Sequence, residues 1–137
     1  MATAPTTGGL HHVSLTVTDL QRSIDFYTTH IGFQLLMKMA PTRVLIGNGT
    51  LLMSLGLPYD PARAIEADTF NENRVGLDHI SFAVENLMAL EEAADYFDEQ
   101  GVDRGEIKDL GGDFGIYVMA FRDPDNIQLE LTAPYNI

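Results

Sequence analysis

Two stretches, one near the start and one past the middle of the chain, share an alternation of apolar and polar residues. They are Leu10–Val17 (LHHVSLTV) and Leu77–Val84 (LDHISFAV). Successive side chains of a β-strand point to opposite faces of a sheet, so this alternation predicts two strands that each have one apolar face. Each strand also carries a histidine at the matched position, His12 in the first and His79 in the second.

A helical pattern follows each predicted strand. In the first half, apolar residues recur at helical spacing from Leu20 to Ile31, and Thr18 fits the start of a capping box. In the second half the apolar stripe runs from Leu87 to Phe97, and Gly101 suits the end of the helix.

Three further strands are predicted after each helix, so each half has the order βαβββ. These strands are Phe33–Met39, Arg43–Ile46, Leu51–Gly56, Val102–Ile107, Gly115–Phe121 and Ile127–Thr132. We therefore expect an α+β fold, with a flexible tail at 1–9 and one domain at 10–137. Within that domain, module one covers 10–57, a linker covers 58–75 and module two covers 76–134. Neither half is large enough to bury a core alone, so the two modules are expected to pack together.

The polar faces of the predicted strands carry three side chains that could bind a metal. They are His12, His79 and Glu130, and they come from separate strands. Two imidazoles and one carboxylate can form a facial metal site that leaves positions open for water and substrate. The simpler interpretation is a solvent-exposed face with two histidines left by a duplication, and the pattern alone leaves both open. His11 should point away from His12 and be structural.

Composition narrows the function classes. The chain is 45% hydrophobic and has no apolar run of about 18 residues, so we expect a soluble protein that does not enter a membrane. Its net charge is −12 with only eight Lys and Arg residues, scattered singly, which argues against nucleic-acid binding. It has no cysteine, hence no disulfide and no thiolate ligand, and a cytoplasmic location is expected.

Three segments together resemble the vicinal oxygen chelate superfamily. They are HHVSLTVTDLQRSIDFYTTHIGF, GLDHISFAV and FRDPDNIQLEL. That superfamily includes glyoxalase I, bleomycin-resistance proteins, fosfomycin-resistance enzymes, methylmalonyl-CoA epimerase and extradiol dioxygenases. The resemblance covers about 10–134 and implies an open β-barrel of two βαβββ modules around a metal-binding cleft. It also implies a homodimer, a small-molecule substrate and a divalent ion (Fe, Mn, Ni or Zn).

Carried over position by position, the resemblance places the metal ligands at His12, Ser54, His79 and Glu130. Ser54 departs from the family pattern, since glyoxalase I members have a glutamate there and epimerases usually a glutamine. Serine is a poor ligand and a poor base at neutral pH, so dioxygenase-like chemistry is slightly favoured over that of glyoxalase I. The dioxygenases, however, usually have a tyrosine at the position of Ala120.

The resulting hypothesis is a metal-dependent enzyme that chelates a small substrate through adjacent oxygens. Its reaction could be dioxygenase-like, or that of a lyase, isomerase or transferase. The metal ligands would be His12, His79 and Glu130, and no side chain stands out as a general base. The pocket is expected to be lined by Ser14, Ser54, Ser81, Ala120, Arg122 and Gln128.

An alternative from another class is a metal-free protein of the bleomycin-resistance type that sequesters a cationic small molecule. The net charge of −12 suits that role. Such proteins generally lack the His, His, Glu set, and the presence of all three residues here favours the enzyme.

Overall fold

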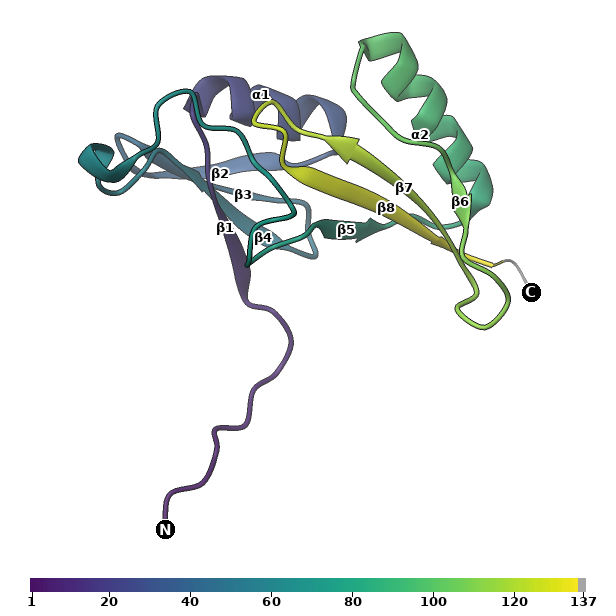
Figure 1. Cartoon of the computed structure of the whole chain (residues 1–137), viewed down its shortest axis with the longest axis horizontal. Helices are drawn as coiled ribbons and strands as arrows, with labels where there is room; N and C mark the ends of the chain where they lie inside the picture. Colours follow the sequence, from purple (N-terminus) through teal and green to yellow (C-terminus); the bar gives the residue numbers. More distant parts are fainter. Residues whose placement is uncertain (136–137) are drawn as a thin grey trace. The chain divides into compact units, whose positions relative to one another are not determined.

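The computed structural model describes residues 1–135 of the chain, and Figure 1 shows the order of its elements. Contacts divide the chain into two compact units, unit 1 (Met1–Ala64) and unit 2, which begins at Ile65. Residues 1–11 hold neither helix nor strand. The elements of unit 1 are β1 (His12–Thr16), α1 (Leu20–His30), β2 (Gln34–Ala40), β3 (Arg43–Gly47), β4 (Leu52–Gly56) and the short 3-10 helix η1 (Pro61–Arg63). Those of unit 2 are β5 (Ile80–Ala83), α2 (Leu87–Gln100), β6 (Lys108–Asp109), β7 (Ile116–Arg122) and β8 (Gln128–Pro134).

Unit 1 is a four-stranded sheet with one helix packed on it. The strand order is β1-β4-β3-β2, in which β1 runs parallel to β4 and the other pairs are antiparallel. Helix α1 contacts β2 and β4 (Figure 1). The core of the unit consists largely of apolar side chains that are at most 6% exposed, among them Leu15, Val17, Tyr27, Ile46, Met53 and Leu55.

Unit 2 repeats this arrangement. Its strand order is β5-β8-β7-β6, and β5 runs parallel to β8. Helix α2 packs on β7 and β8, where the ring of Phe97 lies 4.7 Å from that of Phe121 between centroids. Because both units have the order βαβββ and the same strand pairing, the predicted α+β fold of two βαβββ modules is confirmed.

The strand register gives the correspondence between the two units. Ser14 of β1 lies opposite Ser54 of β4, and Ser81 of β5 lies opposite Glu130 of β8. Ser54 and Glu130 therefore occupy equivalent positions in the repeat. The predicted faces of β8 are also confirmed, since its apolar residues Leu129, Leu131 and Ala133 are buried, while their neighbours Gln128, Glu130 and Thr132 are partly exposed.

Two details of the predicted secondary structure were wrong. Helix α1 is capped by Asp19, whose side chain accepts a hydrogen bond from the backbone N–H of Arg22 at 3.0 Å, so Thr18 is not the cap. The strand predicted at Val102–Ile107 is a single bridge between Arg104 and Phe121, and the regular strand β6 comes later. This segment passes the edge of the sheet, where one neighbouring strand is enough to fix only a few backbone hydrogen bonds.

Across the described residues 1–135, none of the helices has the length and apolar character that a membrane crossing requires.

Candidate functional site

Two of the three predicted metal ligands meet in unit 2. His79 immediately precedes β5 and Glu130 lies in the middle of β8. The Nε2 atom of His79 lies 3.7 Å from Oε1 of Glu130. The His79 side chain is 41% exposed and that of Glu130 is 19% exposed, so both remain open to a ligand. An imidazole nitrogen and a carboxylate oxygen at this separation can bind the same ion.

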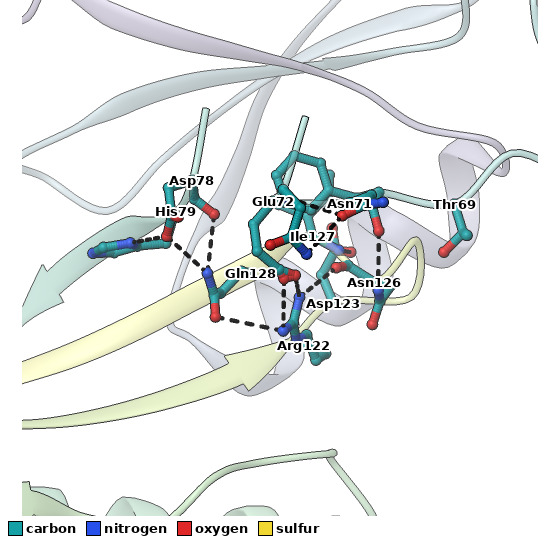
Figure 2. Close-up of polar contacts among 12 residues, drawn as sticks. Thr69, Asn71, Glu72, Asp78, His79, Arg122, Asp123, Asn126, Ile127 and Gln128 are labelled. Atoms are coloured by element: carbon teal, nitrogen blue, oxygen red, sulfur yellow. Dashed lines mark hydrogen bonds and ion pairs between the residues drawn. The ribbon is translucent and has the colours of Figure 1, made fainter. Parts of the chain in front are cut away.

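The other ring nitrogen of His79 is held by its neighbour in the chain. Nδ1 of His79 lies 2.7 Å from Oδ1 of Asp78 (Figure 2). A carboxylate only accepts hydrogen bonds, so the short contact with Asp78 favours the tautomer that has its proton on Nδ1. This tautomer leaves Nε2, the ring nitrogen nearer to Glu130, able to bind a metal ion.

Asp78 is in turn held by β8. The side-chain amide of Gln128 donates to Oδ1 of Asp78 at 3.0 Å and to the backbone carbonyl of Asp78 at 3.1 Å (Figure 2). The carbonyl oxygen of the same amide accepts from Nη2 of Arg122 at 3.4 Å. Gln128, predicted to line the pocket, thus links Asp78 to an arginine of β7.

Arg122 is fixed by a carboxylate from the segment before β5. Its Nη1 and Nη2 atoms donate to the two oxygens of Glu72 at 2.8 and 3.0 Å, a fork-to-fork geometry. The hydrogen bond from Arg122 lowers the pKa of Glu72, and the same bond raises the pKa of Arg122. The charge of Arg122 is therefore matched within unit 2, and whether it also contacts substrate stays a prediction.

Glu72 is positioned by a loop that is tied to the turn between β7 and β8. The backbone N–H of Phe70 donates to the carbonyl of Asp125 at 2.9 Å, and the side-chain amide of Asn126 donates back to the carbonyl of Phe70 at 3.0 Å. These bonds hold residues 70–72 beside the end of β7. Glu72, Arg122, Gln128 and Asp78 form a chain of hydrogen bonds to His79, which we call the His79 network.

The carboxylate of Glu130 has a partner on its own strand. The hydroxyl of Thr132 donates to Oε1 of Glu130 at 3.2 Å, and the hydroxyl of Ser81 lies 2.5 Å from that of Thr132. Ala120 lies opposite Glu130 on β7. Ser81 thus contacts Glu130 through Thr132.

In unit 1 the third predicted ligand, His12, contacts another histidine instead of a carboxylate. Nδ1 of His12 lies 2.9 Å from Nδ1 of His11, and the two rings pack edge to face. The expectation that His11 points away from His12 was wrong. Strand β1 begins only at His12, so the alternation of the pleat does not fix the direction of the preceding side chain.

The two predicted pocket serines of unit 1 bind each other. The hydroxyl of Ser54 donates to that of Ser14 at 2.7 Å and accepts from Nη1 of Arg43 at 3.3 Å. Ser54 is buried. Its hydroxyl is therefore engaged on both sides by protein groups.

A hollow of about 510 Å3 lies beside this face of unit 1. His12 pairs with Leu52 on β4, Leu52 with Gly47 on β3, and Gly47 with Gln34 on β2, so the four form one row across the sheet. The volume is within the range of ligand sites, about 300–1,000 Å3. The hollow is lined by Gly32, Gln34, Leu36, Gly47, Asn48, Gly49, Thr50, Leu51 and Leu52.

Within either unit alone, the described residues contain no group of three His, Cys, Asp or Glu side chains that could hold a metal. Unit 2 supplies His79 and Glu130, and His12 belongs to unit 1. A set of three ligands would therefore combine both units, and it stays a prediction.

Sequence reasoning overlooked three residues that hold the predicted ligands: Asp78, Glu72 and Thr132. The repeat itself offered a signal for Asp78, because LHH and LDH place His11 and Asp78 at the same position before each histidine. The alternation of β8 could have indicated Thr132. Nothing in the sequence pointed to Glu72, which lies 50 residues from the arginine it binds.

The fold of the chain is shared with solved structures of several proteins. A glyoxylase/bleomycin resistance protein/dioxygenase domain from Frankia sp. EAN1pec is 30% identical, with a TM-score of 0.80 over 96% of this chain and 95% of that one. FosX, a fosfomycin resistance protein from Listeria monocytogenes, is 20% identical, with a TM-score of 0.71 over 93% of this chain and 94% of that one. Lactoylglutathione lyase from Agrobacterium tumefaciens is 19% identical, with a TM-score of 0.72 over 94% of this chain and 96% of that one.

A comparison with curated protein sequences found no match. A family model does match residues 9–131, which is most of the chain and includes both histidine strands and Glu130. The chain therefore belongs to the Glyoxalase/Bleomycin resistance protein/Dioxygenase superfamily.

Proposed function

We propose that this protein is a divalent-metal-dependent enzyme with His12, His79 and Glu130 as the metal ligands. Its substrate is a small molecule that presents two adjacent oxygens to the ion. The observation that carries the proposal is the pairing of His79 Nε2 with Glu130 Oε1 at 3.7 Å, combined with the contact of Asp78 on the other ring nitrogen. A solvent-exposed face without function needs neither feature.

The residues present suit such an ion. Imidazole and carboxylate donors bind Fe, Mn, Ni and Zn, and the hydrogen bond from Nδ1 to a carboxylate is the usual support of a metal-binding histidine. When bound, the ion supplies Lewis-acid chemistry toward a substrate with adjacent oxygens, or dioxygen chemistry if it is Fe(II). Asp78 keeps the proton of His79 on Nδ1, and Thr132 orients the carboxylate of Glu130.

The serine at position 54 and its hydrogen bonds support dioxygenase-like chemistry over that of glyoxalase I. Ser54 is the unit 1 equivalent of Glu130, and its hydroxyl is engaged by Ser14 and Arg43. Unit 1 therefore offers no carboxylate at this position, either as a fourth ligand or as a base for proton transfer. Three protein ligands leave more of the coordination shell to substrate than four do.

We also propose that the protein forms a homodimer. All seven residues of the edge strand β2 are exposed, and four of the exposed side chains are large and apolar: Leu35, Leu36, Met37 and Met39, each 51–55% exposed. Exposed apolar patches of this kind mark contact sites, and an unpaired strand edge favours pairing with another chain. Sedimentation of the native protein and of a Leu36→Lys, Met37→Lys variant tests this, and a monomeric native protein would contradict it.

Metal binding is the first test of the enzyme. The metal-stripped protein is titrated with Fe(II), Mn(II), Ni(II) and Zn(II) by calorimetry, beside His79→Ala, Glu130→Gln and the control Glu91→Gln on the exposed side of α2. We expect one ion per chain for the native protein and the control, and a loss of about 100-fold or more in affinity for the two site variants.

Equal binding by all four proteins would place the metal elsewhere and overturn the ligand assignment. Failure of the native protein to bind any of the four ions would overturn the proposal that it is a metal-dependent enzyme. The metal-free alternative, sequestration of a cationic molecule by a chain of net charge −12, would then be the function to examine.

A further inference from the structure

Arg43, on the polar face of the unit 1 sheet, is a buried cation. The residue is 8% exposed, and its position in β3 lies opposite Gly56 of β4. One guanidinium nitrogen, Nη1, donates to Ser54 Oγ at 3.3 Å. The guanidinium carbon lies 4.2 Å from the centre of the Tyr59 ring. These contacts fix the orientation of the group without neutralising its charge.

No carboxylate of unit 1 balances this charge. Among residues 1–64, all of which the structure describes, no aspartate or glutamate forms an ion pair with Arg43. Two arginines of unit 2 differ, since Arg122 binds Glu72 and Arg104 binds Asp98 at 2.7–2.9 Å. Removing a charge from water without an opposite charge nearby is costly, and buried charges are normally paired, so an anionic ligand would supply the partner that Arg43 lacks in unit 1. A guanidinium has five N–H donors, and the Ser54 bond uses one of them.

The backbone of β4 makes room for the guanidinium. A Cβ atom built on Gly56 would lie 2.3 Å from the guanidinium carbon of Arg43, so any other residue at position 56 would displace the side chain. Bare backbone at Gly56 and the ring of Tyr59 both contact the planar group. The group is thereby oriented before a ligand arrives, which lowers the entropy cost of binding.

We propose that Arg43, with the paired hydroxyls of Ser54 and Ser14, binds an anionic group of the substrate, a carboxylate. As a substrate subsite this rests on the proposed function. A guanidinium matches the two oxygens of a carboxylate through two parallel hydrogen bonds, and a serine hydroxyl can add a third. The substrate is then a small organic acid that carries its pair of adjacent oxygens at a separate point.

The strand register gives the spacing of this subsite from His12. His12 pairs with Leu52, and Ser14 pairs with Ser54, two residues further along β4. The guanidinium of Arg43 reaches the row of Ser54, so it lies about 7 Å along the strand from the row of His12, at about 3.3 Å per residue.

The test uses benzoate and its neutral counterpart benzamide as probes. The metal-stripped full-length protein, labelled with 15N, is titrated with each probe while the Nε–H signals of its arginines and the backbone N–H signals of Ser14 and Ser54 are followed by NMR. The backbone signals report binding in every variant. Arg43→Lys keeps the charge but loses the forked donors, and Arg63→Lys, in the exposed helix η1, is the matched control. Circular dichroism checks that both variants fold.

We expect benzoate to shift the Arg43 signal saturably and benzamide to leave it in place. Arg43→Lys should bind benzoate about tenfold more weakly, which corresponds to one charge-assisted hydrogen bond, and Arg63→Lys should bind it normally. Equal responses to the two probes, or normal binding by a folded Arg43→Lys variant, would overturn the anion subsite. Because no metal is present, this failure is distinct from a failure of the metal titration, which would overturn the proposed function instead.

Discussion

The two units share a fold and a histidine but carry their charged side chains at different ends of the polar face. In unit 2 the charges lie beside the histidine, where the His79 network reaches Asp78 through Gln128 and Arg122. By register, the unit 1 equivalents of Gln128 and Arg122 are Leu52 and Gly47, which line the hollow instead.

At the other end of the polar face, unit 1 carries the charged residue and unit 2 does not. Unit 1 has Arg43 opposite Gly56, while unit 2 has Val118 opposite Thr132. The apolar face of each sheet must keep its pattern because it forms the core under a helix. The polar face has no such constraint, so after a duplication it can diverge row by row. Under the two proposals, both units contribute to metal binding, and unit 1 recognises the anionic group of the substrate.

The largest effect is expected on the free energy of unfolding, from one core substitution in each unit. Comparing the two tests whether the cores are equally well packed. Met53 and Leu129 occupy the same position in the repeat, and both are fully buried. Truncation to alanine removes buried methylene groups and leaves a cavity, so Met53→Ala and Leu129→Ala should each lower the free energy of unfolding by about 2–5 kcal/mol. Urea denaturation followed by circular dichroism measures both. A much smaller loss for one variant would show that its unit has the less tightly packed core.

The next largest effect is expected on metal affinity. It compares Asp78 and His11, the residues that precede the two histidines. Removing the carboxylate in Asp78→Ala should weaken metal binding by about 10–100-fold, because His79 loses the partner that fixes its tautomer. His11→Ala should have a smaller effect, since a neighbouring imidazole is a weaker support than a carboxylate. Calorimetric titration with the ion that the native protein binds decides this, and an equal loss in both variants would contradict the asymmetry.

A smaller effect of similar size in both units is expected at the helix starts. Asp19 accepts a hydrogen bond from the backbone N–H of Arg22 at 3.0 Å, and Asn86 accepts one from that of Ala89 at 2.9 Å. Loss of the cap in Asp19→Ala or Asn86→Ala should lower the free energy of unfolding by about 1 kcal/mol. Urea midpoints that do not move from the native value would exclude a capping role.

The smallest expected effect is a pH dependence of the stability, which arises from Glu72 in unit 2. The hydrogen bond from Arg122 holds the pKa of Glu72 below its ordinary value of 4.5. A carboxyl whose pKa is lower in the folded state contributes stability above its unfolded pKa and loses that contribution as the pH falls through its folded pKa. Glu72→Gln should therefore be less stable than the native protein at neutral pH, with the difference shrinking below pH 4.5. Urea midpoints across this range measure it, beside Glu91→Gln as control, and a difference that stays constant with pH would contradict it.

Much of the fold could be predicted from the chain because its signals are local. Alternation along β1, β5 and β8 indicated which side chains are the less exposed ones, and Gly101, in the left-handed conformation with a φ of 71°, ends α2 as expected. Errors arose where the local signal had competitors. Thr18 and Asp19 can both cap a helix, and the segment after Gly101 has strand-forming residues but only the edge of a sheet to pair with.

The candidate site was predictable only in part. The face pattern placed His79 and Glu130 on the same side of two strands, and the structure brings them within 3.7 Å. The face pattern could not indicate that Arg122 forms an ion pair with Glu72, whereas Arg43 has no carboxylate partner in its unit. The partner of Arg122 lies 50 residues away in the chain, so the residues next to either arginine do not reveal whether a carboxylate binds it.

The sequence by itself determined the repeat, the two apolar faces and the positions of the three predicted ligands, because strand and helix periodicity depend on neighbours within a few residues. The tertiary structure decided which charged groups meet. Glu72 and Arg122 are brought together across 50 residues by the turn that holds the segment before β5, and Ser14 and Ser54 across 40 by the register of two parallel strands. Contacts at such separations depend on strand pairing and loop attachment, and these are properties of the folded chain as a whole.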